Sequence, residues 1–401
     1  MGTVQSVQQE RLHGLDAVRG YALLLGVVFH ATLSFLPGPA VWPVMDSHRS
    51  ALLGGVFYVS HIFRMTTFFL IAGFFASMVV QKRGIRAFVK DRTRRILVPF
   101  VVSWPVLLAA IVLAVWGALG HVPPPPPRPP GAVLAVPLTH LWFLYLLLWF
   151  YAAAVAARVS VERLGDAGAR LMAGVDALVR GIMEYRAALV FLALPAAVAL
   201  NAYQPWFVWA GIPPPDQSLV PPLPSAIQYG LAFGFGWLLH RQAGLIEVLA
   251  GRWLSYTIVA VILSAGLVAL IGTTPVTPGV AKFGHALLYV LAIWTATFAV
   301  IAMALRFLSN PSPVRRYVAD SSYWIYLIHL PILIVLQGLV RDLDWPAELK
   351  IVAILAVALP LMLASYQFLV RRTVIGAVLN GRRIPAAAPR APMPVTDHAA
   401  V

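Results

Sequence analysis

Apolar residues gather in ten stretches along the chain, separated by charged or proline-rich segments. A helix needs about 20 mainly apolar residues to cross the hydrocarbon core of a bilayer. The pattern therefore predicts an all-α fold, a polytopic transmembrane helical bundle with about ten spans. The predicted spans are residues 16–36, 52–80, 96–118, 139–157, 187–202, 225–240, 254–273, 284–305, 321–340 and 349–370.

The segments between the spans contain helix breakers and one charged stretch. Prolines cluster at 123–130, 213–215, 221–222 and 311–313, which predicts extended loops. Residues 158–186 are charged and spaced for a short interfacial helix. We therefore expect one membrane-embedded domain over residues 1–370. Residues 371–401 are basic and rich in Pro and Ala, which is typical of a disordered cytoplasmic tail.

The basic residues favour one orientation, because Lys and Arg accumulate on the cytoplasmic side of membrane proteins. With both termini cytoplasmic, most of the 30 Lys and Arg residues fall in cytoplasmic segments. The exceptions are Arg49, Arg64, Arg128, Lys282, Arg341 and Lys350. The first apolar run is longer than a signal-peptide core, so we expect a retained first span and a multi-pass protein of the cell membrane.

Composition narrows the function classes. The chain is 60% hydrophobic and only 11% charged, with a mean hydropathy of +0.81, so we expect a lipid bilayer to cover much of its surface. The absence of cysteine excludes disulfides, thiolate metal sites and a cysteine nucleophile. The net charge of +15 follows the predicted topology and forms no basic patch with exposed aromatics, so no nucleic-acid partner is expected.

Ionisable residues inside the first span are candidates for function, since each costs about 2.5–3.5 kcal/mol on insertion scales. Arg19 and His30 are eleven positions apart, which places them on one helix face and roughly 16 Å apart along the axis. Asp16 precedes Arg19 by three residues and can pair with it. The structural alternatives are that His30 only bonds a neighbouring helix and that Arg19 anchors the span at the headgroups.

Two further pairs lie inside predicted spans. His61 and Arg64 are three residues apart and share a face, so they can bind an anionic group or a partner helix. Tyr326 and His329 share a face of the ninth span, where a structural hydrogen-bonding role is the main alternative. Pro331 leaves a backbone carbonyl one turn earlier free for a polar neighbour.

Arg92 and Arg95 close a strongly basic segment directly before the third span. They lie about one helical turn apart, so both guanidinium groups can face one site and hold phosphates in bidentate fashion. Positive-inside topology alone is the competing explanation for basic residues in this segment.

In combination these residues resemble the integral-membrane acyltransferase-3 family, and more narrowly its glucan biosynthesis protein C-like branch. The resemblance covers nearly the whole chain. The motifs that carry it are Leu15–Gly20 followed by His30, Phe68–Phe74, the Arg92-x-x-Arg95 pair, His140–Leu144 and Tyr326–Pro331.

The resemblance implies ten spans, acyl-CoA as the donor substrate and transfer to sugars or glycans. On that analogy His30 is the essential histidine, and Arg19, Arg92 and Arg95 lie near the donor. We therefore expect an O-acyltransferase that moves an acetyl or succinyl group from cytoplasmic acyl-CoA to a hydroxyl of a carbohydrate or glucan. No permanently bound cofactor or metal is expected.

In the expected mechanism His30 is the general base and Asp16 orients Arg19. His61, Arg64, Tyr326 and His329 are the candidate substrate-binding residues. The alternative class is a proton-coupled transporter or flippase of a glycan, glycolipid or organic acid, which would favour inverted repeats that this sequence does not clearly show. The sequence fixes neither the acyl group, nor the acceptor, nor the oligomeric state.

Overall fold

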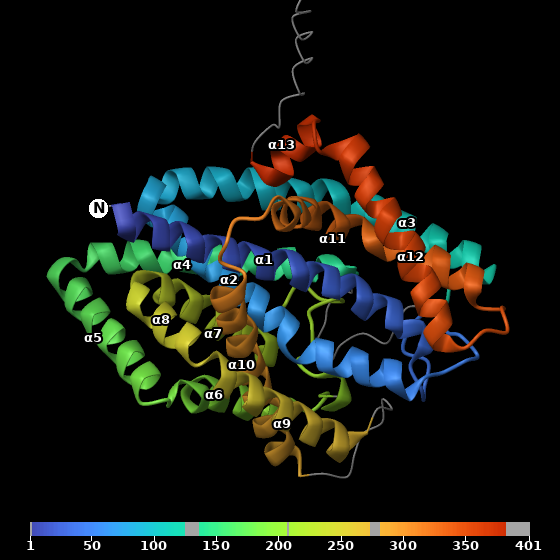
Figure 1. Ribbon diagram of the computed structural model, residues 1–401, viewed down its shortest axis with the longest axis horizontal. Coiled ribbons are helices and arrows are strands. Elements are labelled where there is room, and N and C mark those ends of the chain that lie inside the picture. The colour runs from blue at the N-terminus through green and yellow to red at the C-terminus, as the bar shows by residue number, and fades with distance from the viewer. Residues whose placement is uncertain (1, 125–135, 207, 273–280, 382–401) are drawn as a thin grey trace, which may run out of the picture.

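The computed structural model describes residues 2–124, 136–206, 208–272 and 281–381, and these ranges form a helical bundle without strands (Figure 1). The helices are α1 (Gly2–Thr32), α2 (Ala51–Arg92), α3 (Val98–Leu119), α4 (Trp142–Arg163), α5 (Gly165–Glu184), α6 (Ala188–Ala202), α7 (Leu223–Arg241), α8 (Ala243–Gly251), α9 (Trp253–Ile271), α10 (Lys282–Phe307), α11 (Pro313–Val340), α12 (Ala347–Ser365) and α13 (Val374–Asn380). Short 3₁₀ turns at Leu33–Phe35, Thr139–Leu141 and Val208–Ala210 and π turns at Thr93–Leu97 and Tyr366–Val370 complete the described elements. The all-α prediction is confirmed.

The helices are those of a multi-pass membrane protein. Within the described ranges, seven helical runs are long and apolar enough to cross a bilayer, or eight if the bent pair α5 and α6 counts as one span. One of the seven runs joins α2, the following π turn and α3 into 69 residues. Each predicted span contains a helix, but the count of ten and the cytoplasmic termini stay predictions.

Three segments outside the predicted spans are also described. The polar start of the chain is also helical. Helix α1 begins at Gly2, and no proline interrupts its first residues. The charged segment 158–186 contains α5, and α6 follows it at an angle of 105°, while the interfacial position of α5 stays a prediction. The tail was expected to be disordered from residue 371, yet residues 374–380 form α13. Residues 382–401 lie outside the described ranges.

Glycines allow α2 and α7 to approach each other closely. A Cβ atom on Gly73 would lie 1.9 Å from the carbonyl oxygen of Phe233, and one on Gly236 would lie 1.9 Å from that of Leu70. Small residues commonly let membrane helices pack backbone to backbone, where van der Waals contact replaces the hydrophobic driving force. This crossing fixes α2, which carries His61 and Arg64 on the same stretch of helix.

Helix α1 packs against α2, α10 and α11 in the middle of the bundle (Figure 1). Its faces toward α2 and α11 carry the residues that the sequence singled out. The exposed apolar side chains lie instead on outer helices such as α3, α9 and α12, where lipid would cover them. The candidate site is therefore interior, between α1, α2, α4 and α11.

Candidate functional site

A large cavity lies next to His30. Its volume is about 760 Å³, and its walls come from α1, α2, α3, α4, α11, the 3₁₀ turn Thr139–Leu141 and three loops. Four of the candidate residues from the sequence line it together with His30. These are His61, Arg64, Tyr326 and His329.

A second pocket of about 250 Å³ collects the arginines. Arg19, Arg92 and Arg95 all line it, so Arg92 and Arg95 do face one pocket, while their role in binding phosphates stays a prediction. We call this the arginine pocket and the larger one the histidine cavity. Three guanidinium groups around one pocket suit an anionic ligand.

The two spaces adjoin. Leu23, Phe68, Phe143 and Tyr326 each line both the histidine cavity and the arginine pocket. On α1, Leu23 follows Arg19 by one turn and precedes His30 by two, so one helix face runs from the pocket to the cavity. A ligand anchored at the arginines therefore has a course toward His30 past these four side chains.

The arginine pocket is built on an irregular turn. Thr93–Leu97 form a π turn, a geometry that is frequent at functional sites. Pro99 has no N–H to offer to the Arg95 carbonyl, and the Tyr323 hydroxyl donates to that oxygen at 2.9 Å instead. The turn thus aims the Arg95 side chain while its backbone stays satisfied.

Acidic neighbours modulate the arginines. The predicted pair forms, with Arg19 Nη2 3.2 Å from Asp16 Oδ1. Asp91, which the sequence analysis did not select, lies 3.4 Å from Arg92 and 3.7 Å from Arg95. Arg95 also donates to the carbonyl oxygen of Leu379 in α13, at 3.3 Å from Nη2. An anionic ligand would compete with these contacts for the guanidinium groups.

Backbone carbonyls determine which nitrogen of His30 carries its proton. His329 Nδ1 lies 2.7 Å from the carbonyl oxygen of Tyr326, which can only accept, so Nδ1 is the protonated nitrogen of neutral His329. Its Nε2 then accepts from His30 Nδ1 at 3.0 Å. His30 Nδ1 also lies 2.8 Å from the carbonyl oxygen of Gly26. His30 Nε2 is left with a lone pair and no hydrogen-bond partner among the described residues.

A third histidine supports this pair. His140 Nε2 donates to the carbonyl oxygen of Leu327 at 3.1 Å, and that oxygen is the one Pro331 leaves free one turn later. The prediction that a polar neighbour uses this carbonyl is therefore confirmed. In the sequence His140 stands only as part of a motif. The carbonyl that Pro331 leaves without an N–H was the signal that a donor such as His140 must lie nearby. Its ring lies 5.1 Å from the His329 ring.

Arg64 is a buried cation without a carboxylate. Its side chain is 6% exposed, and Nε and Nη1 have no hydrogen-bond partner. The guanidinium carbon lies 4.0 Å from the centre of the Phe29 ring. The nearby His61 ring lies 5.1 Å from the same phenyl ring, and its Nδ1 is also unpartnered. Arg64 lines the histidine cavity, so its positive charge lies beside any ligand bound there, although Nε and Nη1 are themselves buried.

Two polar side chains hold this region together. The Tyr326 hydroxyl donates to the carbonyl oxygen of His140 at 2.7 Å, so that proton is already engaged. Gln337 donates to the carbonyl oxygen of His30 at 3.0 Å and accepts from the indole N–H of Trp42 at 2.9 Å. Gln337 is neutral, so its place inside a span carries no insertion cost that would mark it in the sequence.

The loop before α7 contributes an acid to the histidine cavity. Asp216 lines the cavity, and its backbone carbonyl accepts from Leu138 N–H at 2.8 Å. Burial raises the pKa of the Asp216 carboxyl, while backbone N–H groups lower it to a smaller extent. Within the described part of the chain, no cluster of three or more His, Cys, Asp or Glu side chains is arranged to hold a metal ion.

An interior histidine cavity joined to an arginine pocket, in a bundle of apolar helices, marks a candidate functional site for an anionic ligand. The sequence model of the acyltransferase-3 family, described as an acyltransferase domain, matches residues 12–366, and the chain belongs to this family. The match favours the acyltransferase interpretation of the sequence over the transporter alternative.

The chain is also similar to curated bacterial relatives. It is 29% identical over 150 residues to the Glucans biosynthesis protein C of Escherichia coli strains SMS-3-5 / SECEC and K12. The matched segment covers 35% of this chain and 37% of each relative. The chain thus spans little more than a third of the length of these relatives. No solved structure matches the chain.

Proposed function

We propose that the protein transfers an acyl group from the thioester of acyl-CoA, bound in the arginine pocket, to a hydroxyl of a carbohydrate, with His30 as the general base. The observation that carries this proposal is the shared wall of the arginine pocket and the histidine cavity. The name of the E. coli relatives supports a glucan as the acceptor. In this proposal the protein lies in the cell membrane, and its arginine pocket faces the cytoplasm, where acyl-CoA is found.

Each end of the donor has a place in this arrangement. The CoA phosphates bind Arg19, Arg92 and Arg95, displacing part of their contacts with Asp16 and Asp91. The pantetheine arm passes between the four shared side chains toward the histidine cavity. This course brings the thioester to His30 while the charged part of CoA stays at the arginines.

The chemical step then uses the free nitrogen of His30. Nε2 removes the proton from the acceptor hydroxyl as its oxygen attacks the thioester carbonyl carbon. The guanidinium group of Arg64, which lines the cavity, stabilises the developing oxyanion. When the C–S bond breaks, the imidazolium of His30 returns the proton to the CoA sulfur. The Tyr326 hydroxyl, engaged with His140, supports the site rather than the oxyanion.

Acyl transfer by the purified protein in liposomes tests the proposal. Radiolabelled acetyl-CoA and succinyl-CoA are each supplied with gluco-oligosaccharides, and wild type is compared with His30→Ala. Labelled oligosaccharide is expected from wild type, with a loss of about 10²–10⁴-fold in kcat in the variant, the usual contribution of a general base. Full activity of His30→Ala would refute the mechanism, and no transfer from either donor would refute the proposed substrates.

Arginine variants separate donor binding from chemistry. Arg92→Gln is expected to raise the KM for acyl-CoA about 10-fold or more, since charge-assisted hydrogen bonds are worth about 1.5–3 kcal/mol. Arg83→Gln, on an exposed residue of the same basic segment, is the matched control. Arg64→Gln should lower kcat with both donors if Arg64 binds the oxyanion. A rise in KM for succinyl-CoA alone would instead mean that it binds the terminal carboxylate of that donor.

A further inference from the structure

Residues 36–50 form a loop between the first 3₁₀ turn and α2, and this loop covers one side of the histidine cavity. We call it the strap. Although it is not helical, Leu36, Val44 and Asp46 within it are almost completely buried. Trp42, between these buried points, lines the cavity. The strap is therefore a fixed part of the cavity wall.

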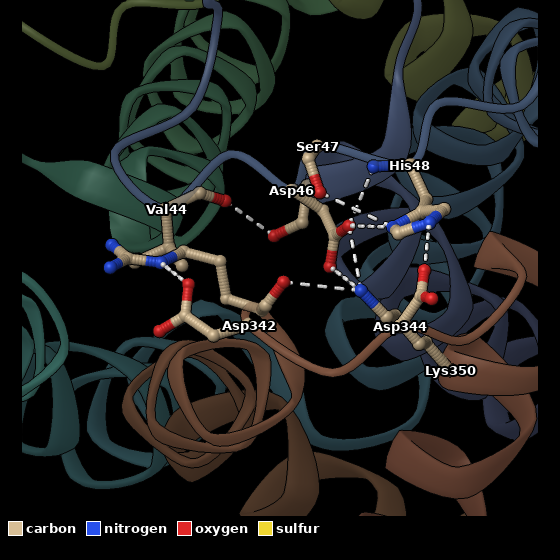
Figure 2. A network of polar contacts seen from close by, with 9 residues as sticks. Val44, Asp46, Ser47, His48, Asp342, Asp344 and Lys350 are labelled. Atoms are coloured by element: carbon tan, nitrogen blue, oxygen red, sulfur yellow. Dashed lines mark hydrogen bonds and ion pairs between the residues drawn. The ribbon is translucent and has the colours of Figure 1, made fainter.

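A buried ion pair anchors the strap to α12 (Figure 2). Lys350 Nζ donates to both carboxylate oxygens of Asp46 at 2.8 Å and to the carbonyl oxygen of Arg341 at 3.1 Å. The Lys350 side chain is 0% exposed and that of Asp46 is 2% exposed. The backbone N–H of His48 donates to the same carboxylate at 2.8 Å. Desolvating two ions costs several kcal/mol each, so this pair fixes the loop's position more than it adds stability.

The anchored strap presents an aromatic ring to His30. The Trp42 ring centre lies 6.2 Å from that of His30. The indole N–H is taken by Gln337, which also bonds the His30 backbone. Trp42 therefore offers apolar ring surface to the cavity, in a position fixed relative to the His30 backbone.

A carboxylate and an amide from another loop line the same cavity. Asp216 and Gln217 are positioned by backbone bonds to residues 136 and 138, directly before His140. Asp216 lines the cavity, forms no ion pair within the described ranges, and its carboxyl accepts from the backbone N–H groups of Asp216 and Gln217. An aromatic platform with a few well-placed polar groups suits a sugar, whose C–H face is apolar and whose edge carries hydroxyls.

We propose that Trp42 and Asp216 form the acceptor subsite, in which a sugar ring stacks on Trp42 and bonds Asp216 through one hydroxyl. A second hydroxyl of the same ring then reaches Nε2 of His30. This inference rests on the proposed acyl transfer, because it identifies where the carbohydrate acceptor of that reaction binds.

Steady-state kinetics with separate readouts for acceptor and donor test the subsite. Labelled acyl-CoA and soluble gluco-oligosaccharides are supplied to the protein in liposomes, and CoA release without acceptor is measured in parallel. Trp42→Ala and Asp216→Asn are each expected to raise the acceptor KM about 10-fold or more. The donor KM and the acceptor-independent CoA release should stay at the wild-type level.

Two controls keep the test decisive. Trp42→Phe retains a stacking ring and is expected to keep the acceptor KM within about 3-fold of wild type, even if Trp42→Ala folds poorly. Trp345→Ala replaces a partly exposed tryptophan next to α12 that does not line the cavity. It should leave the KM values for acceptor and donor unchanged.

The outcomes separate this inference from the proposed function. A wild-type acceptor KM in Trp42→Ala and Asp216→Asn, with transfer intact, would overturn the subsite alone. If Trp42→Phe raised the acceptor KM as much as Trp42→Ala does, the stacking role would be overturned, because phenylalanine shares the aromatic ring with tryptophan. A wild type that transfers no acyl group to any carbohydrate would overturn the proposed function and the subsite together.

Discussion

The contact between His329 and His30 makes a quantitative prediction about catalysis. His329 Nε2 accepts from His30 Nδ1 at 3.0 Å, and its own Nδ1 is held by the Tyr326 carbonyl. His329→Leu introduces an apolar side chain of similar size and removes the hydrogen-bond acceptor. His329→Gln places an amide oxygen where Nε2 was, so it retains an acceptor for His30.

The expected magnitude follows from the charge on His30 during the reaction. Once Nε2 has taken the acceptor's proton, the charged ring donates from Nδ1 to His329 and to the carbonyl oxygen of Gly26 at 2.8 Å. Removing His329 loses one of these two partners, and a hydrogen bond to a charged group is worth about 1.5–3 kcal/mol. We therefore expect His329→Leu to lower kcat about 10- to 150-fold. The loss is smaller than for His30→Ala because Gly26 still holds the tautomer.

The assay is acyl transfer at saturating donor and acceptor, with unfolding temperatures of both variants measured in detergent as the control for folding. His329→Gln should lie between wild type and His329→Leu, and the KM for donor and acceptor should stay unchanged. Equal activity of wild type and His329→Leu would refute the reasoning. A raised KM with unchanged kcat would show that His329 binds substrate, as the sequence suggested, and does not position His30.

Three further predictions concern the scaffold. Gly236→Ala should destabilise the protein by roughly 1–3 kcal/mol or more through its contact with α2, whereas Gly234→Ala, with no atom within 4 Å, should not; unfolding temperatures in detergent decide this. Lys350→Met should cost about 3–5 kcal/mol because it leaves Asp46 buried and unpaired, and adding Asp46→Leu should recover part of that loss in the same assay. Tyr323→Phe should raise the donor KM a few-fold, since it removes the donor that holds the π turn of the arginine pocket; an unchanged KM would show that the turn holds without it.

Helix periodicity predicted which residues meet when they lie on one helix. Arg19 and His30 were placed on one face of the first span, and they line adjoining spaces that share Leu23. Arg92 and Arg95 were placed one turn apart and do face one pocket, although Arg95 itself lies in a π turn. Local geometry is fixed by the 3.6-residue repeat, so such relations can be read from spacing.

Contacts between distant segments could not be read in this way. The pairing of His30 with His329 joins residues 299 positions apart, and the link from Trp42 to Gln337 joins residues 295 positions apart. Trp42 lies in a loop, where no periodicity applies, and the neutral Gln337 carries no insertion cost that would draw attention to it. Only Pro331 gave a signal for a long-range contact, because a missing N–H leaves a carbonyl that must find a donor.

The two most buried cations of the described chain differ in a way that bears on catalysis. Lys350 is paired with both carboxylate oxygens of Asp46 at 2.8 Å, at the anchor of the strap. Arg64 is 6% exposed, lines the histidine cavity and has two buried nitrogen atoms without a hydrogen-bond partner. A buried charge is costly unless it is paired, and at the strap the fold supplies the counter-ion itself. At Arg64 it does not, so the compensating negative charge has to come from what binds there. A neutral thioester supplies that charge only as its carbonyl oxygen becomes an oxyanion, and an unpaired Arg64 therefore favours the transition state over the bound substrate.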